Sequence, residues 1–288
     1  MFPSNQSALV KVSVLGEIAN PAMPGLPASP YFVSAEGEPM LIPMFGGLVY
    51  NVGLGDRAIG WAAELIQPGV SIKNANAAAN VALGVYACLG NRARVMSGAA
   101  QGVTGMVIGK SGRFAEHVIC DFAPADIEKM APGDKIQVQA YGIGMKLNDF
   151  PTIDFKGCSP ELLEAINPDS DGDTLVVPVK GVAPSVLAGA GAGLTSESGA
   201  INLQTSDPKL LADNGLDDLR FGDLVAITDW DSRYGHGYLR GSVVVGVVCQ
   251  GGSFRSGYGP GLAIIMTSRD GKIQPVVNAG ANIKDLMA

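Results

Sequence analysis

The sequence has few of the residues that most often carry catalysis, metal binding or redox chemistry. It contains two histidines, two tryptophans and four cysteines in 288 residues. The cysteines, Cys88, Cys120, Cys158 and Cys249, are far apart and form no CxxC pair, which argues against a zinc ribbon or a thioredoxin-type motif. We therefore expect free, buried thiols.

Charge and long apolar runs are also scarce. Charged residues make up 16% of the chain, the net charge is −7 at pH 7, and no run rich in Lys or Arg occurs. Nucleic acids and anionic membranes attract basic patches, so neither is an expected partner. The chain has no stretch of about 18 apolar residues, and its N-terminus lacks a basic segment followed by an apolar one. The sequence predicts a cytoplasmic protein.

Glycine and short apolar runs are abundant. The chain has 39 glycines and 18 prolines, and most apolar runs are short, rich in Val and Ile, and bounded by Gly or Pro, as strands are. Helical spacing is confined to residues 74–89, expected as a buried helix capped by Asn74, and to short segments at 124–130 and 159–166. The pattern predicts an α+β, predominantly β fold with few short helices.

Two kinds of segment occur once in each half of the chain. One is a Gly-Asp turn before an alternating apolar run, and the other is a strand, a glycine-rich turn and a second strand. The Gly-Asp segments lie at residues 132–142 and 221–231. The paired strands with their glycine-rich turn lie at residues 105–122 and 242–268. Turn residues cluster at 168–172. We expect two packed barrel-like or sandwich-like β units, residues 1–168 with one buried helix and residues 169–288 with glycine-rich loops.

The first candidate site surrounds His236, in the segment TDWDSRYGHGYLRG. Flanking glycines would leave the imidazole unshielded, and Asp229 or Asp231 is close enough in sequence to orient it as a general base. Arg233 could hold a substrate carboxylate. The alternative is a histidine tied into a turn by its own backbone, with the aspartates capping strand ends.

The second candidate is the glycine-rich loop at residues 251–261, GGSFRSGYGPG. Its N–H groups could bind an anion, with Ser253 and Ser256 as further donors and Arg255 as a bidentate clamp. The loop does not match the P-loop pattern, which argues against nucleotide hydrolysis. The alternative is a long hairpin connection between two buried strands.

The third candidate is the glycine-rich stretch at residues 189–208, which offers the hydroxyls of Thr195 and Ser196. Its length without periodicity is typical of a binding loop or lid. A nucleophilic hydroxyl would need a base within reach, and His236 is the only histidine in this half of the chain. No GxSxG motif is present.

Two weaker candidates remain. His117 lies on an apolar strand, where we expect a histidine with satisfied hydrogen bonds, and Asp149 and Asp154 flank a nearby proline turn. The segment NPDSDGDT places Asn167, Asp169 and Asp171 at positions one, three and five of a calcium loop, followed by glycine at position six. The glutamate required at position twelve is absent. Calcium is therefore a side hypothesis, against an ordinary Asx turn.

Five segments together resemble an uncharacterised prokaryotic family known only as a domain of unknown function, with N-terminal and C-terminal β-rich parts. They read QPGVSIKNAN, GKSGRFAEHVICDF, GDKIQVQAYGIGMKL, GAGAGLTSESGAINLQTSDP and RGSVVVGVVCQGGSFRSGYGPG, and they span most of the chain. The resemblance implies the fold but no activity. A fainter similarity to acetamidase/formamidase-type proteins, through Gly-Asp turns and glycine-rich late loops, is an analogy of fold only.

The leading hypothesis is an enzyme that hydrolyses a small amide or cyclic amide. His236, oriented by Asp229 or Asp231, would activate water, Arg233 or Arg255 would hold a substrate carboxylate, and glycine N–H groups would stabilise the oxyanion. One alternative is a non-catalytic protein that binds a small anion or metabolite. Another is a structural homo-oligomer whose exposed strands pair between subunits.

Overall fold

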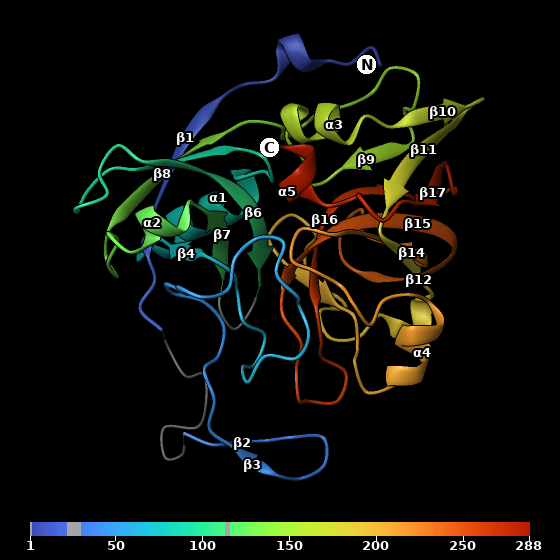
Figure 1. The fold of residues 1–288 in the computed structure, drawn as a ribbon. Coiled ribbons are helices and arrows are strands. Elements are labelled where there is room, and N and C mark those ends of the chain that lie inside the picture. Colours follow the sequence, from blue (N-terminus) through green and yellow to red (C-terminus); the bar gives the residue numbers. More distant parts are fainter. Residues whose placement is uncertain (1, 22–29, 113–115) are drawn as a thin grey trace.

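The computed structural model describes residues 2–21, 30–112 and 116–288. The fold is mostly β, with five short α-helices among these residues, as the sequence predicts. Figure 1 shows a barrel built from the N-terminal half beside a second group of sheets built mainly from the C-terminal half. No helix in the described part of the chain combines the length and apolar character needed to cross a membrane.

The barrel is closed by six antiparallel strands in the order β1-β4-β7-β6-β5-β8. Their bounds are β1 Val12–Ile18, β4 Val70–Lys73, β5 Arg92–Val95, β6 Thr104–Ser111, β7 His117–Asp121 and β8 Lys135–Ala140. Side chains alternate along β8, so that Ile136 and Val138 are buried in the barrel core while Lys135 and Gln139 are exposed. Pairing of β1 with β8 closes the barrel and leaves no free edge.

The helix predicted at residues 74–89 forms, but it is shorter and more exposed than expected. Helix α1 spans Ala77–Tyr86, and its cap is Asn76, whose side chain accepts a hydrogen bond from Ala79 N at 3.0 Å. Leu83 is its one buried residue and packs into the barrel core, while the side chain of Val81 is 63% exposed. The prediction of a buried helix capped by Asn74 is therefore wrong, because only one face of α1 meets the barrel.

The other helices are short. They are α2 Pro124–Ile127, α3 Pro160–Ile166, α4 Pro208–Asp213 and α5 Ile283–Leu286, with 3-10 turns η1 Gln6–Ala8 and η2 Ser185–Leu187. Helices α2 and α3 confirm two predicted segments, although α2 ends at Ile127. Ser159 caps α3 by accepting a hydrogen bond from Leu162 N at 3.0 Å.

The larger sheet of the second part has the order β12-β14-β15-β16-β13, with β9 paired to β16. Its strands are β9 Ile153–Phe155, β12 Gly181–Ala183, β13 Ala200–Asn202, β14 Leu224–Asp231, β15 Gly237–Gln250 and β16 Gly261–Ser268. Two smaller sheets contain β10 Asp169–Asp171, β11 Thr174–Val179 and β17 Ile273–Val277, and β2 Phe32–Val33 with β3 Pro39–Met40. Because β9 comes from the N-terminal half, this half contributes one strand to the larger sheet.

One hydrophobic cluster, distinct from the core inside the barrel, joins the barrel to the larger sheet. Ile108 and Ile119 of the barrel belong to the same buried cluster as Val245 and Val247 of β15. Where β6 meets β15, a Cβ on Gly109 would overlap Cys249 Cβ, so glycine is required there. All four cysteines are free and buried, as the sequence predicts.

Candidate functional site

His236 is enclosed by the fold. Its side chain is only 3% exposed, because residues 193 and 194 cover the turn and exchange backbone hydrogen bonds with it. The imidazole Nδ1 lies 2.9 Å from Ser232 Oγ, and Nε2 has no partner among the described residues. Burial lowers the pKa of His236 to about 4. The expectation of an unshielded imidazole is therefore wrong.

The two aspartates near His236 make other contacts. Asp231 accepts hydrogen bonds from Arg233 Nε at 3.0 Å and from Arg233 Nη2 at 3.0 Å. Although burial opposes it, Arg233 holds the pKa of Asp231 below its usual value. Asp229, with φ of 54°, accepts from Gly241 N at 2.7 Å beside a bulge in β14. No Asp–His236 pair forms, and the Arg233 charge is already neutralised.

The glycine-rich loop at residues 251–261 does bind a carboxylate, but the carboxylate belongs to the protein. Ser253 Oγ donates to Glu64 Oε1 at 2.7 Å, and Phe254 N donates to Glu64 Oε2 at 3.0 Å. Arg255 Nε lies 3.8 Å from Glu64 Oε1, and its guanidinium stacks 4.7 Å above the ring of Phe32. Glu64 is fully buried.

This internal contact corrects the prediction for the loop. Arg255 and Ser253 have the expected anion-binding chemistry, but Glu64 occupies it, while Ser256 is exposed to solvent. Sequence reasoning missed Glu64, and no local signal could reveal it, because 189 residues separate it from Ser253.

The 189–199 segment runs between the barrel and the larger sheet. Lys110 Nζ donates to Glu197 O at 2.6 Å, and Lys156 Nζ donates to the Glu197 carboxylate at 2.8 Å. Ser196 is buried and its hydroxyl lies 3.3 Å from the same carboxylate. The two lysines fix the 189–199 segment to the rest of the protein through Glu197. The Ser196 hydroxyl donates to the Glu197 carboxylate and therefore has a structural role in this arrangement.

Thr195 lines a hollow that we call the His117 cavity, of about 220 Å³. Its walls come from α1, from both strands of the β6–β7 hairpin and from the 189–199 segment, and include Ser111, Gly112, Glu116, His117, Thr195 and Ser198. Thr195 Oγ1 and Ser198 Oγ share a hydrogen bond of 3.0 Å. The other histidine of the chain, His117, therefore lines the same cavity as these hydroxyls.

A buried polar network fixes the ring of His117. Its Nδ1 lies 3.1 Å from Gln67 Oε1, which also accepts from Ser71 Oγ at 2.6 Å. Gln67 Nε2 donates to Ser111 Oγ at 2.8 Å. Because Gln67 Oε1 accepts, His117 Nδ1 carries the proton and Nε2 does not. Burial, with a smaller effect of Lys73, lowers the pKa of His117 to about 4, so the ring is neutral at pH 7.

A second hollow, which we call the amide pocket, has a volume of about 180 Å³. Its walls are Phe45, Leu65, Gly112, Ala190, Gly191, Ala192, Leu194, Ala200, Asn202, Gln250 and Tyr258. Gly112 and Leu194 also line the His117 cavity, so the two hollows are neighbours.

Asn202 and Gln250 are the polar side chains buried in the amide pocket. They are 6% and 5% exposed, and neither side-chain amide has a hydrogen-bond partner among the described residues. Both lie against Gly261, where a Cβ would be 2.4 Å from Gln250 Oε1 and 3.0 Å from Asn202 Nδ2. Glycine at this position therefore makes room for the two amides.

Backbone strain is concentrated in the wall of the same pocket. Phe45 and Leu65 have φ of 56° and 48°, a left-handed conformation that large side chains rarely adopt. Hydrogen bonds from Phe45 N to Glu64 O at 3.0 Å and from Leu65 N to Gly252 O at 2.9 Å hold them in place. Strained backbone that the surroundings maintain is typical of functional sites.

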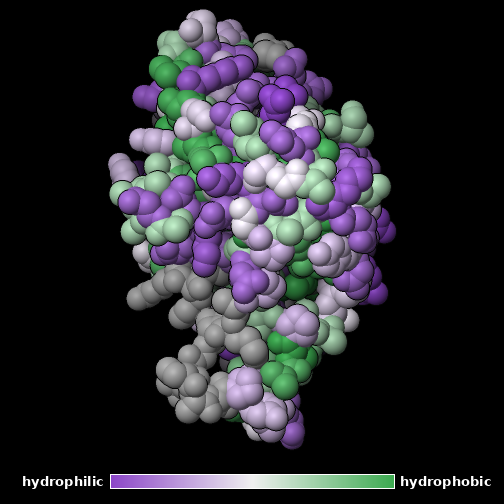
Figure 2. Space-filling view, turned by 90° about the vertical axis from the view of Figure 1, so that its left-hand side faces the viewer, coloured by the Kyte–Doolittle hydropathy of each residue, from purple (hydrophilic) through white to green (hydrophobic). Residues whose placement is uncertain are grey.

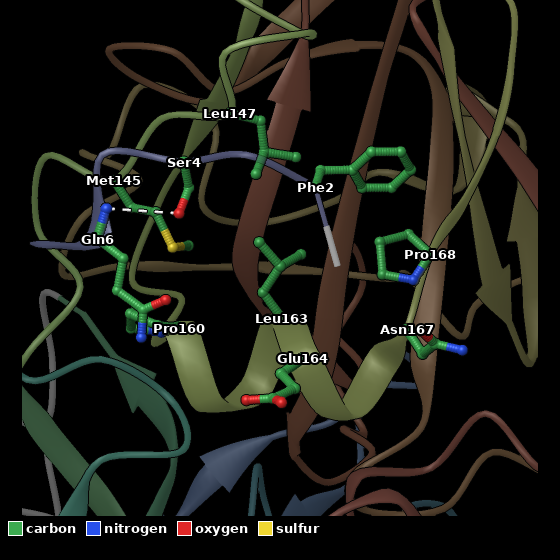
Figure 3. Close-up of a pocket in the computed structure, with 10 residues that line it drawn as sticks. All are labelled: Phe2, Ser4, Gln6, Met145, Leu147, Pro160, Leu163, Glu164, Asn167 and Pro168. Atoms are coloured by element: carbon green, nitrogen blue, oxygen red, sulfur yellow. Dashed lines mark hydrogen bonds between the residues drawn. The ribbon is translucent and has the colours of Figure 1, made fainter.

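A third hollow, of about 150 Å³, lies between the N-terminal segment and α3 (Figure 3). Apolar side chains, including Met145, Leu147 and Leu163, face into it. Ser4 Oγ is engaged by Gln6 N at 3.4 Å. The polar side chains that line it, such as Gln6 and Glu164, belong to residues that are not buried, and we place no site there.

The remaining predicted residues lie away from both sites. Asn167, with φ of 47°, ends α3, and Asp169 and Asp171 belong to β10, which pairs with β11. The segment therefore forms a β-hairpin, and the described residues contain no cluster of three His, Cys, Asp or Glu side chains suited to a metal. Asp149 and Asp154 are exposed and line neither hollow.

These features define a mostly β protein in which a closed barrel and a larger sheet are joined by one hydrophobic cluster and enclose two adjoining polar hollows. The chain belongs to the DUF4438 family, a domain of unknown function, whose N-terminal part matches residues 31–164 and whose C-terminal part matches residues 165–287. It is similar to the crystal structure of TM1086, with 38% identity and a TM-score of 0.92 over 99% of this chain and 98% of that one. No curated protein matches the chain.

Proposed function

We propose that the protein binds a small, uncharged polar molecule in the amide pocket. The observation that carries this proposal is the pair of side-chain amides of Asn202 and Gln250, which belong to buried residues, line the pocket and have no hydrogen-bond partner among the described residues. A ligand that offers both a donor and an acceptor, as an amide or cyclic amide does, would supply the missing hydrogen bonds.

The surroundings favour an uncharged ligand over an anion. None of the described residues that line the pocket carries a charge. Arg255, the cation expected to bind an anion, faces Glu64 instead. The pocket is also smaller than the roughly 300–1,000 Å³ of sites for drug-sized ligands, so the molecule is a small metabolite.

Binding can be tested by thermal denaturation and calorimetry with propionamide, 2-pyrrolidinone, hydantoin and uracil as probes, and with acetate and sulfate as anionic controls. At least one uncharged amide should raise the melting temperature in a saturable manner, because it binds only the folded state. Asn202→Leu and Gln250→Met should each weaken that binding at least about tenfold, while Gln274→Met, on exposed β17, should not. Protection by the anions alone, or amide binding unchanged in both pocket variants, would contradict the proposal.

A homo-oligomer is a further proposal, supported by the β2–β3 hairpin. Figure 1 shows this hairpin projecting from the lower end of the molecule. Hydrophobic side chains reach the surface near the same end in Figure 2. Val33 is 62% exposed and Leu41, next to β3, is 55% exposed. A second copy of the chain would bury them. Light scattering should show an oligomer that Val33→Asp with Leu41→Asp dissociates, and a monomeric wild type would end this proposal.

A further inference from the structure

The His117 cavity combines three features that the binding proposal does not use. The ring of His117 has its proton fixed on Nδ1 by Gln67, and its Nε2 has no partner among the described residues. Thr195 and Ser198 present hydroxyls in the same cavity. The amide pocket lies next to it, across Gly112 and Leu194.

We propose that the His117 cavity is a hydrolytic site for small amides and esters, in which His117 acts as general base on a water molecule and Gln67 is its positioning residue. The proposal rests on the proposed function only for its natural substrate class, since the amide pocket would bind one end of the same molecule. The hydrolytic step itself needs only the groups of the His117 cavity.

Gln67 is well placed to position the ring. It is fully buried, and its amide is held from both ends by Ser71 and Ser111. Its backbone N also donates to Phe45 O at 3.1 Å, which ties the ring to the strained wall of the amide pocket. Catalytic histidines are oriented in this way by an acceptor on Nδ1, most often a carboxylate. A neutral amide fixes the same tautomer without raising the basicity of the ring.

Within the described residues, two charged side chains are placed near the ring. Lys73 of β4 lowers the pKa of His117, and Glu116 lines the cavity beside it. Because burial already keeps the imidazole neutral, the base is available across the range from about pH 5 to pH 8.

The chemistry balances without a metal or a second reactant. The Nε2 lone pair takes a proton from water while the water oxygen bonds to the carbonyl carbon, and the π electrons move to the carbonyl oxygen, which the Thr195 hydroxyl stabilises. Collapse of this intermediate breaks the C–N or C–O bond. The proton on Nε2 passes to the leaving group, so the products are a carboxylic acid and an amine or alcohol.

The test uses p-nitrophenyl acetate, a small activated ester cleaved by the same step. Wild type should hydrolyse it faster than an equal concentration of free imidazole, and kcat/KM should rise through an apparent pKa of about 4 and stay level to pH 8. His117→Gln should lower kcat/KM by about 10² to 10⁴, the usual contribution of a positioned base. His236→Gln is the matched control, since these are the two histidines of the chain, and should retain the wild-type rate.

Gln67 is tested by a shift in the pH profile, which a merely structural role would not produce. Gln67→Glu should move the rise in kcat/KM to higher pH, because a carboxylate beside Nδ1 favours the charged ring. Gln67→Leu should lower kcat more than it changes KM. If either variant folds poorly, ¹⁵N chemical shifts of the two imidazoles in wild type still report the tautomer, and His117 should carry its proton on Nδ1.

Several results would overturn the inference. They are a His117→Gln rate equal to wild type, a wild-type rate no greater than that of imidazole, a rise through pH 6.5, or a proton on Nε2. Gln274→Met, which lies outside both hollows, should hydrolyse the ester at the wild-type rate. Ester hydrolysis that depends on His117 in a protein that binds no uncharged amide leaves the His117 site standing, and amide binding without ester hydrolysis leaves only the binding proposal.

Discussion

Acidification from pH 7 to pH 5 should destabilise this protein through its two buried histidines. His117 and His236 are 8% and 3% exposed, and burial lowers the pKa of each to about 4. In the unfolded chain their pKa returns to about 6.5. Between these values the unfolded state binds more protons than the folded state, so stability falls as the pH drops.

The magnitude follows from the two pKa values. With a folded pKa of about 4 and an unfolded pKa of about 6.5, linkage predicts that each histidine lowers the free energy of unfolding by about 2 kcal/mol between pH 7 and pH 5. The two together would remove about 4 kcal/mol, a large part of the roughly 5–15 kcal/mol of a typical domain. The loss begins near pH 6.5 and is complete near pH 4.

Buried carboxyl groups act in the opposite direction. Burial raises the pKa of Asp121 and of Asp223, so the contribution of each to the stability of the folded protein increases as the pH falls. A comparison of variants cancels this contribution, because the carboxyl groups stay in place. In His236→Gln the loss of stability between pH 7 and pH 5 should be about 2 kcal/mol smaller than in wild type, whatever the stability of the variant at pH 7.

Urea unfolding followed by circular dichroism at pH 7, 6 and 5 measures these differences. Between pH 7 and pH 5 wild type should lose the most free energy of unfolding, the single variants His236→Gln and His117→Gln should lose less, and the double variant should lose the least. If all four proteins lose the same free energy between pH 7 and pH 5, the histidines are not neutral in the folded state, and the reasoning from burial fails.

Two further predictions concern packing and charge. Gly109→Ala should destabilise the protein by about 1–3 kcal/mol in thermal or urea unfolding, because its Cβ would overlap Cys249. Gly237→Ala, which has open space around it, should change the free energy of unfolding little. Equal effects of the two substitutions would contradict the packing argument. Arg255→Ala should lower the free energy of unfolding by about 1 kcal/mol, because Glu64 loses its cationic partner. Sulfate should protect neither wild type nor this variant against heat. Saturable protection of wild type alone would restore the anion-site hypothesis.

The sequence alone determined the local structure. Short Val- and Ile-rich runs between glycines became strands, and Ser159 capped α3. The 251–261 loop contacts a carboxylate through Ser253, the backbone N–H of Phe254 and Arg255, although not through its glycine N–H groups. The isolated cysteines are free and buried. The strands and the helix cap depend on neighbours a few residues away, which sequence patterns report directly.

Only the tertiary structure decided which residues form the sites. The 251–261 loop meets Glu64, and Gln67 meets His117 across 50 residues, so neither partnership has a local signature. His236 was expected to be open because glycines flank it, yet the 189–199 segment covers it. Burial and hydrogen-bond partners depend on long-range packing of the barrel against the sheet, and short-range spacing carries no record of that packing.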